Sequence, residues 1–114
     1  MEAKPLISPS QFAGCDLRVG VILSAQALHG ARKPAYVLQV DFGALGTLKS
    51  TAQLAGDYTA EELVGRHIVA VVNFPPKQIG PFMSQCLVTG CYREDGSVIL
   101  VSPDIPVPNG AKLG

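Results

Sequence analysis

Three stretches of this chain alternate apolar and polar residues with a period of two, and this alternation constrains the fold more than any other feature. The stretches are residues 16–23, 36–42 and 47–54. Successive side chains of a β-strand point to opposite faces of a sheet, so an alternating stretch predicts a strand with one buried face. The first half of the chain is therefore predicted to contribute three strands to one β-sheet.

A short helix is predicted directly after the third strand, within residues 57–65. Thr59 suits the N-cap, and Glu62, three positions later, suits its partner in a capping box. Gly65 is a typical residue at the end of a helix. These local signals explain the acidic residues of the first turn without a catalytic role.

Two further strands are predicted at residues 68–74 and 85–92, on either side of a loop that contains three prolines. The dipeptide Asp95-Gly96 is a strong tight-turn signal and leads into a sixth strand at residues 98–101. The loop between the two strands combines apolar and polar residues, and loops held on a rigid sheet often carry binding residues.

The order of elements is three strands, one helix, two strands and a further hairpin strand. This order predicts an all-β fold, a five-stranded OB-fold barrel with one short helix between its third and fourth strands. A β-sandwich would need a different number of strands and gives the helix no role. With 114 residues, we expect a single domain, residues 1–114, with its core at about 15–102 and extensions at 1–14 and 103–114.

The N-terminal extension contains a second predicted helix. Ser8 suits its N-cap, Pro9 its first position and Gln11 its third. Gly14 is expected to end it, and so short a helix is expected to depend on docking of Phe12. The proline-rich C-terminal extension is expected to run along the barrel or along a neighbouring molecule.

Composition limits the cellular setting and the possible chemistry. No apolar run reaches the roughly 20 residues that cross a bilayer, and the start lacks the pattern of a signal peptide. We therefore expect a soluble, cytoplasmic protein without membrane insertion. Cys15, Cys86 and Cys91 are odd in number, so we expect reduced thiols, buried or half-buried, and no metal site or cofactor.

Catalysis finds little support in the residue pattern. His29 and His67 stand alone, without a nucleophile at a recognisable spacing, and the chain has no glycine-rich phosphate motif. We therefore expect a binding module and not an enzyme.

The third strand and the loops around the barrel offer a polar surface. An OB-fold holds oligonucleotides on the face of strands two and three. The residues in question are Lys49, Ser50, Thr51 and Gln53, with Arg32, Lys33 and Lys77 in loops. Nine basic and nine acidic residues give a net charge of zero, whereas phosphate binders are usually basic. A solvated sheet face with scattered charges explains the same residues equally well.

The loop after the fourth strand favours a different ligand. Its apolar members suit a pocket for extended polypeptide, because methionine adapts to varied partners and proline loses little entropy on ordering. They are Phe74, Pro76, Ile79, Phe82 and Met83. The two aromatic residues could equally stack on bases.

Several runs of the sequence resemble one known family nearly end to end. They are CDLRVGVI, ARKPAYVLQVDFG, STAQL, YTAEELVGRHIVAVVNFPPKQI and PDIPVPNGAKL. They are similar to the CsaA-type secretion chaperones, stand-alone members of the tRNA-binding domain family that is also appended to methionyl- and phenylalanyl-tRNA synthetases. The most specific part is the run NFPP, residues 73–76, followed by Ser84.

This resemblance implies an OB-fold homodimer that binds tRNA or similar RNA and acts as an export-related chaperone for unfolded or precursor polypeptides. The family's binding positions fall on Ser50, Thr51, Gln53, Asn73, Lys77 and Ser84, with Gln78 and Gln85 beside them. The synthetase-type relatives carry a Lys-Met-Arg-Gly run before the serine, and here Gln78 replaces a basic residue. Fewer cations weaken the attraction for phosphate, so polypeptide is the leading predicted ligand and tRNA the alternative.

A homodimer is also predicted from the extensions. The apolar residues at 5–12 and 105–113 would be poorly covered in a monomer. The sequence does not identify a particular tRNA or precursor protein.

Overall fold

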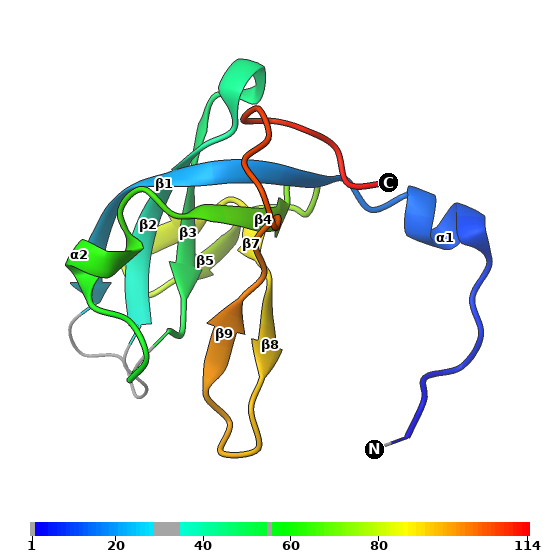
Figure 1. Cartoon of the computed structure of the whole chain (residues 1–114), viewed down its shortest axis with the longest axis horizontal. Coiled ribbons are helices and arrows are strands. Elements are labelled where there is room, and N and C mark those ends of the chain that lie inside the picture. Colours follow the sequence, from blue (N-terminus) through cyan, green and yellow to red (C-terminus); the bar gives the residue numbers. More distant parts are fainter. Residues whose placement is uncertain (1, 29–34, 55) are drawn as a thin grey trace.

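A computed structural model of the chain describes residues 2–28, 35–54 and 56–114. Its centre is one curled antiparallel sheet of five strands in the order β3-β2-β1-β4-β7 (Figure 1). The strands are β1 (Leu17–Leu28), β2 (Ala35–Asp41), β3 (Thr47–Ala52), β4 (His67–Val71) and β7 (Leu87–Val88). The bounds differ from the predicted ones by one or two residues in β2 and β3 and by more in the first and fourth strands: β1 continues to Leu28 past an irregularity between Ile22 and Ser24, and β4 ends at Val71.

Among the described residues, three short helices accompany the sheet: α1 (Pro9–Ala13), the 3₁₀ helix η1 (Gly43–Leu45) and α2 (Ala60–Leu63). Both predicted capping boxes form, around Ser8 in α1 and around Thr59 in α2. Helix α2 lies between β3 and β4 in the chain, as predicted. The predicted docking of Phe12 is wrong within this chain, because α1 buries none of its residues and the Phe12 side chain stays 47 % exposed.

In the part of the chain that the structure describes, two small hairpins extend from the sheet, and the sequence indicated only one of them. The strands β5 (Lys77–Ile79) and β6 (Phe82–Ser84) pair within the segment that we expected to be an irregular loop. The predicted fifth strand divides, because β8 (Gly90–Tyr92) leaves the sheet after β7 and pairs with β9 (Val98–Leu100). The turn at Gly96 between β8 and β9 forms where expected, with a positive φ of 86°.

The interior of the barrel is packed by one buried apolar cluster. Alternate residues of β2, with Phe42 just beyond it, point inward as the alternating pattern predicts. The fully buried members include Ile22, Leu38, Val40, Phe42, Leu54, Leu63 and Ile68. This cluster is the hydrophobic core of the barrel, on which the surrounding loops rest.

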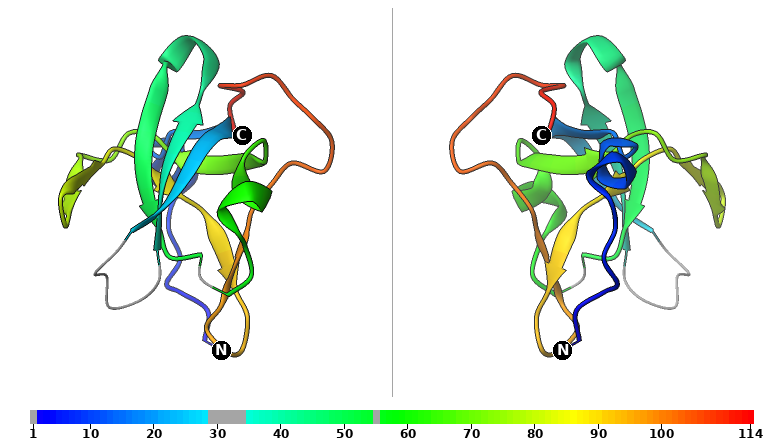
Figure 2. Two further views of the ribbon diagram at one scale, coloured as in Figure 1. Left: turned by 90° about the vertical axis from the view of Figure 1, so that its left-hand side faces the viewer. Right: turned by 90° about the vertical axis from the view of Figure 1, so that its right-hand side faces the viewer.

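A second buried cluster lies on the outer side of β1 and β4, beneath the C-terminal tail. It consists of Leu17, Val19, Val69 and Val71. Hydrogen bonds hold the tail against β1: Gly110 N donates to Val19 O at 2.7 Å, and Val19 N donates to Ala111 O at 2.9 Å. Figure 2 shows this tail and the β5–β6 hairpin on opposite sides of the barrel. The tail therefore runs along the barrel, one of the two predicted arrangements.

Candidate binding groove at the barrel seam

A groove of about 920 Å³ lies beside the two edge strands of the sheet, β3 and β7, which both contribute to its lining. This volume is in the range of protein sites that hold small ligands or peptide segments. Its walls come from β3 and the residues after it, the segment 74–79, the segment 84–90 and the β8–β9 hairpin. We refer to it below as the seam groove.

One end of the seam between β3 and β7 is closed by the segment 84–86. Gln85 N donates to Lys49 O at 2.7 Å, and Lys49 N donates to the Gln85 Oε1 atom at 2.9 Å. Thr51 N donates to the Ser84 hydroxyl oxygen at 3.2 Å. The edge of β3 is therefore satisfied at Lys49 by one main-chain and one side-chain partner, and the groove opens beyond Thr51.

Ser50 and Cys86 seal the closed end from inside. The Ser50 hydroxyl donates to Cys86 O at 2.9 Å, and Ser50 is 1 % exposed. Ser50 was predicted to contact RNA, but in this structure its side chain is buried and bonded to the main chain of Cys86, so it offers no surface to a ligand. Burial raises the pKa of the Cys86 thiol to about 11, and the hydrogen bond with Ser50 partly opposes that shift.

The predicted polar residues divide between the seam groove and other places. Thr51, Gln53, Lys77, Ser84 and Gln85 line the groove. Lys49 and Gln78 are exposed outside its lining. The predictions for Arg32 and Lys33 lie outside the described residues.

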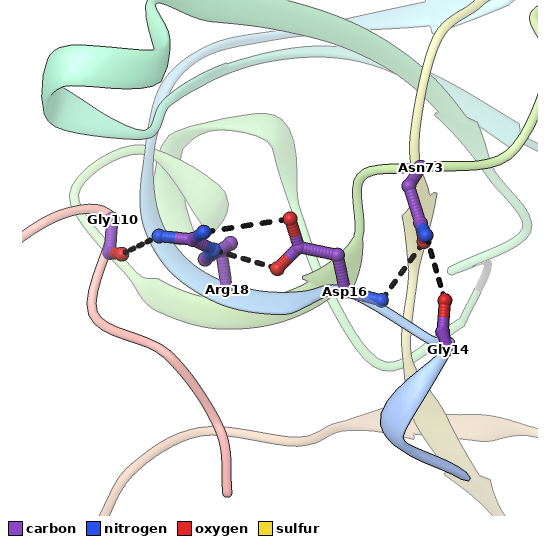
Figure 3. A network of polar contacts seen from close by, with 5 residues as sticks. All are labelled: Gly14, Asp16, Arg18, Asn73 and Gly110. Carbon is purple, nitrogen blue, oxygen red and sulfur yellow. Dashed lines mark hydrogen bonds and ion pairs between the residues drawn. The ribbon is translucent and has the colours of Figure 1, made fainter. Parts of the chain in front are cut away.

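Asn73 has structural partners instead of a place in the groove (Figure 3). Its Oδ1 atom accepts a hydrogen bond from Asp16 N at 2.9 Å, and its Nδ2 atom donates to Gly14 O at 2.8 Å. Both bonds fix the chain between α1 and β1. Nearby, Arg18 pairs with Asp16 at 2.6 Å and donates to Gly110 O at 3.0 Å. The most specific motif of the sequence thus begins with a residue that orients the N-terminal segment.

The predicted apolar residues also divide. Phe74 and Ile79 line the seam groove, whereas Pro76, Phe82 and Met83 are not part of its lining. Phe74 and Met83 expose similar fractions of their surface, 51 % and 45 %. Exposure alone therefore does not show which of the two side chains can contact a ligand in the groove. Their position relative to the groove does.

Residues of the β8–β9 hairpin and of β7 complete the groove, and they were not predicted as ligand contacts. They include Leu87, Val88, Tyr92, Asp95, Ser97, Val98 and Leu100. The sequence did contain one signal for these contacts. An aromatic residue, Tyr92, and two alternating apolar residues, Val98 and Leu100, occur in the strands that follow the NFPP loop. Cys91, expected to be buried or half-buried, is exposed on β8.

The charges lining the groove are balanced. Lys77 stands on one side and Asp95 on the other. Two hydrogen bonds from Ser97, from its hydroxyl and then its backbone N–H, lower the pKa of the Asp95 carboxyl below its ordinary value. Asp95 is therefore anionic at neutral pH, and the groove is not a cationic surface.

Among the described residues no group of three or more His, Cys, Asp or Glu side chains could hold a metal ion. No helix within the described ranges is long and apolar enough to cross a membrane.

A curled five-stranded sheet, with a helix between its third and fourth strands and a groove beside β3, defines an OB-fold binding domain. The chain belongs to the putative tRNA-binding domain family, whose model matches residues 17–112. Family and fold are thus those predicted from the sequence.

Similar solved structures and a curated relative support this membership. The chaperone CsaA of Bacillus anthracis has 43 % identity and a TM-score of 0.92, over 96 % of this chain and 100 % of that one. The CsaA chaperone protein of Picrophilus torridus has 43 % identity and a TM-score of 0.88 over the same shares. A methionine–tRNA ligase of Flavobacterium johnsoniae is 32 % identical over 110 residues, which are 96 % of this chain and 15 % of that enzyme. The chain therefore spans only a small part of the enzyme's length.

Proposed function

We propose that this chain is a non-enzymatic, chaperone-like binding protein whose seam groove takes extended segments of unfolded or precursor polypeptides. The observation that carries the proposal is the composition of the groove walls. Aromatic and aliphatic side chains reach them from three of the four wall segments: Phe74, Ile79, Leu87, Tyr92, Val98 and Leu100. Unfolded chains expose the apolar side chains that such walls can cover. The similarity to two proteins described as chaperones supports the same ligand.

A matched pair of variants tests the proposal. Phe74→Ala removes a half-exposed apolar side chain inside the groove, and Met83→Ala removes one outside it. We expect Phe74→Ala to weaken binding of a fluorescent apolar peptide about tenfold, as loss of an aromatic anchor does. It should also reduce suppression of aggregation of a chemically unfolded test protein. Met83→Ala should leave both unchanged. Equal effects of the two variants would contradict the proposal.

An export-related role in the cytoplasm is the finer form of this proposal. An odd number of cysteines suits a reducing compartment, and the chain resembles CsaA-type secretion chaperones. The test compares capture of one precursor protein with and without its targeting segment by the full chain. Preferential capture of the precursor form supports the export role, and equal capture contradicts it.

A second candidate ligand is structured RNA, especially tRNA. The match to a putative tRNA-binding domain over residues 17–112 favours it. Lys49 is exposed on β3, and Lys77 lies at the groove. A tRNA titration should show affinity that falls steeply with salt if several phosphates are contacted. Absence of binding at low salt would remove this candidate, and competition between tRNA and peptide would place both on one surface.

We further propose that the chain forms a homodimer. In Figure 1 the segment before β1 lies away from the barrel. Its apolar side chains are open to solvent, with Leu6 fully exposed and Ile7 63 % exposed. A second copy that covered them would remove this apolar surface from water. Light scattering at micromolar concentration should give twice the chain mass, and Leu6→Ser with Ile7→Ser should shift it toward the monomer. A monomeric parent protein would contradict the proposal.

A further inference from the structure

We propose, building on the polypeptide-binding function above, that Asp57 and Tyr58 are positioning residues, which hold the β8–β9 hairpin in place as one wall of the seam groove. The hairpin supplies several residues of the groove lining, yet it forms a small sheet of its own. A wall outside the main sheet keeps one position only if other contacts restrain it. The segment 56–58, directly before α2, makes such contacts.

The hairpin is bonded to β4 at its base. Thr89 N donates to Val69 O at 2.9 Å, and Val69 N donates to Val101 O at 3.2 Å. From this base the hairpin extends away from the sheet (Figure 1). Bonds at one end do not restrain the direction of the far end, so the base alone leaves the hairpin able to pivot.

The segment 56–58 contacts the hairpin at two separate points. Leu100 N donates to the Tyr58 hydroxyl oxygen at 3.1 Å, and Arg93 Nη1 pairs with Asp57 Oδ1 at 3.0 Å. Leu100 faces Gly90 in the ladder, three positions before Arg93, so the two points are about 10 Å apart along the hairpin. Two separated contacts fix the direction of the hairpin as well as its position.

Tyr58 is itself attached to the barrel. The Tyr36 hydroxyl, on β2, donates to Tyr58 O at 2.9 Å. The Arg66 guanidinium lies over the Tyr58 ring, 5.0 Å from its centroid. Tyr58 therefore connects the main sheet to the hairpin. A wall that is fixed before the ligand arrives loses less freedom on binding, which strengthens the complex.

These contacts lie outside the groove. Side chains of neighbouring strand residues point to opposite faces, so Arg93 lies on the other face of the hairpin from Tyr92, which lines the groove. Asp57, Tyr58 and Arg93 are not part of the groove lining. Their substitution can therefore change ligand binding only through the placement of the hairpin, and this separates a positioning role from direct contact.

Tyr58→Phe removes the acceptor of Leu100 N and keeps the ring under Arg66. The probe is a capped, fluorescent eight-residue peptide of alternating leucine and serine, titrated against the full chain by anisotropy. We expect about fivefold weaker binding, as if the wall were in place for one fifth of the time. Unchanged affinity would overturn the proposal.

Hydrogen exchange of the same variant separates positioning from a general structural role. The amide of Leu100 should exchange faster in Tyr58→Phe, whereas the amides of β2 should be unchanged, because only the hairpin is released. Faster exchange throughout the barrel would overturn the proposal, since weaker binding would then reflect partial unfolding.

The ion pair allows a test by rescue. Arg93→Asp replaces attraction to Asp57 with repulsion, and we expect about threefold weaker peptide binding, the size of an exposed ion pair. The double variant Asp57→Arg with Arg93→Asp exchanges the two charges and should restore the parent affinity. Glu94→Lys reverses a neighbouring charge that forms no ion pair among the described residues, and it should have no effect. Failure of the rescue, or an equal effect of Glu94→Lys, would overturn the role of the pair.

Phe74→Ala distinguishes failure of this inference from failure of the proposed function. If Phe74→Ala weakens peptide binding but Tyr58→Phe and Arg93→Asp do not, the groove binds polypeptide with a wall that needs no support from the segment 56–58. The inference would then be overturned while the proposed function stands. If the parent chain does not bind the peptide, the proposed function is wrong and the inference falls with it.

Discussion

The two ends of the seam between β3 and β7 differ in which groups lie against the edge of β3. At the closed end, Gln85 and Ser84 bond to the edge, and Ser50 and Cys86 fill the space behind it. At the open end, beyond Thr51, apolar side chains of the β8–β9 hairpin stand across a groove. The closed end contributes stability through buried polar pairs, and the open end leaves surface for a ligand. Substitutions at the two ends should therefore separate stability from binding.

The largest expected effect comes from the floor that the groove shares with the core. Leu54 lines the groove and is 2 % exposed. Leu54→Ala should lower the free energy of unfolding by about 2–5 kcal/mol, because it removes apolar contacts and leaves a cavity. Urea denaturation measures this loss. A loss below about 1 kcal/mol would mean that neighbouring side chains readily fill the cavity. The open end of the groove would then not be a preformed site.

Alkaline pH should weaken the closed end through Cys86. Its thiol has a pKa of about 11 in the folded chain against an ordinary value of 9.0. The folded state therefore favours the protonated thiol. The resulting stabilisation is fully present below pH 9 and is lost as pH rises toward 11, by about 2–3 kcal/mol.

Urea denaturation between pH 8 and pH 11.5 can isolate this contribution from those of lysine and tyrosine. The parent chain should lose more stability over this range than Cys86→Ala, in which the thiol is absent. Identical pH dependence of the two proteins would show that Cys86 is not shielded at the seam.

Loss of the Ser50 hydroxyl should have the next largest effect. Ser50→Ala removes a buried donor from Cys86 O, and we expect a loss of about 1–2 kcal/mol in the free energy of unfolding. Ser24→Ala, at an exposed position of β1, is the control and should change stability by less than about 0.5 kcal/mol. Similar small effects for both would indicate that Ser84, whose hydroxyl lies 3.3 Å from Cys86 O, replaces the missing donor.

The smallest effect on stability is expected at the open end. Phe74→Ala and Met83→Ala each remove a half-exposed side chain and should change the free energy of unfolding by less than about 0.5 kcal/mol. Thermal denaturation of the two variants checks this. A large destabilisation by Phe74→Ala would mean that the groove wall is part of the core, and loss of binding in that variant would no longer identify a contact.

Local signals in the sequence were sufficient for much of the fold. Alternation over residues 36–42 predicted which side of β2 is buried, because the side-chain period of a strand is a local property. The capping residues Ser8 and Thr59 predicted the starts of both α-helices for the same reason. The order of strands and helix was then enough to indicate the barrel.

The seam could not be predicted, because its contacts join residues far apart in the chain. The side chain of Gln85 reaches Lys49 across 36 positions, and that of Asn73 reaches Gly14 across 59. Residue type suggests that an amide can bind a ligand but does not show that its bonds are already used. The β5–β6 hairpin was missed because the prolines around Lys77 and Ile79 are typical of irregular loops.

The attachment of the C-terminal tail to β1 has a consequence for the order of folding during synthesis. Arg18 bonds to Gly110 across 92 positions, whereas all five strands of the sheet lie within residues 17–88. A ribosome that adds about 5–20 residues per second therefore releases the whole sheet before the segment that covers Leu17, Val19, Val69 and Val71. Until that segment emerges, the nascent barrel presents an uncovered apolar face, so the sheet is exposed to aggregation for the time that the segment takes to follow it.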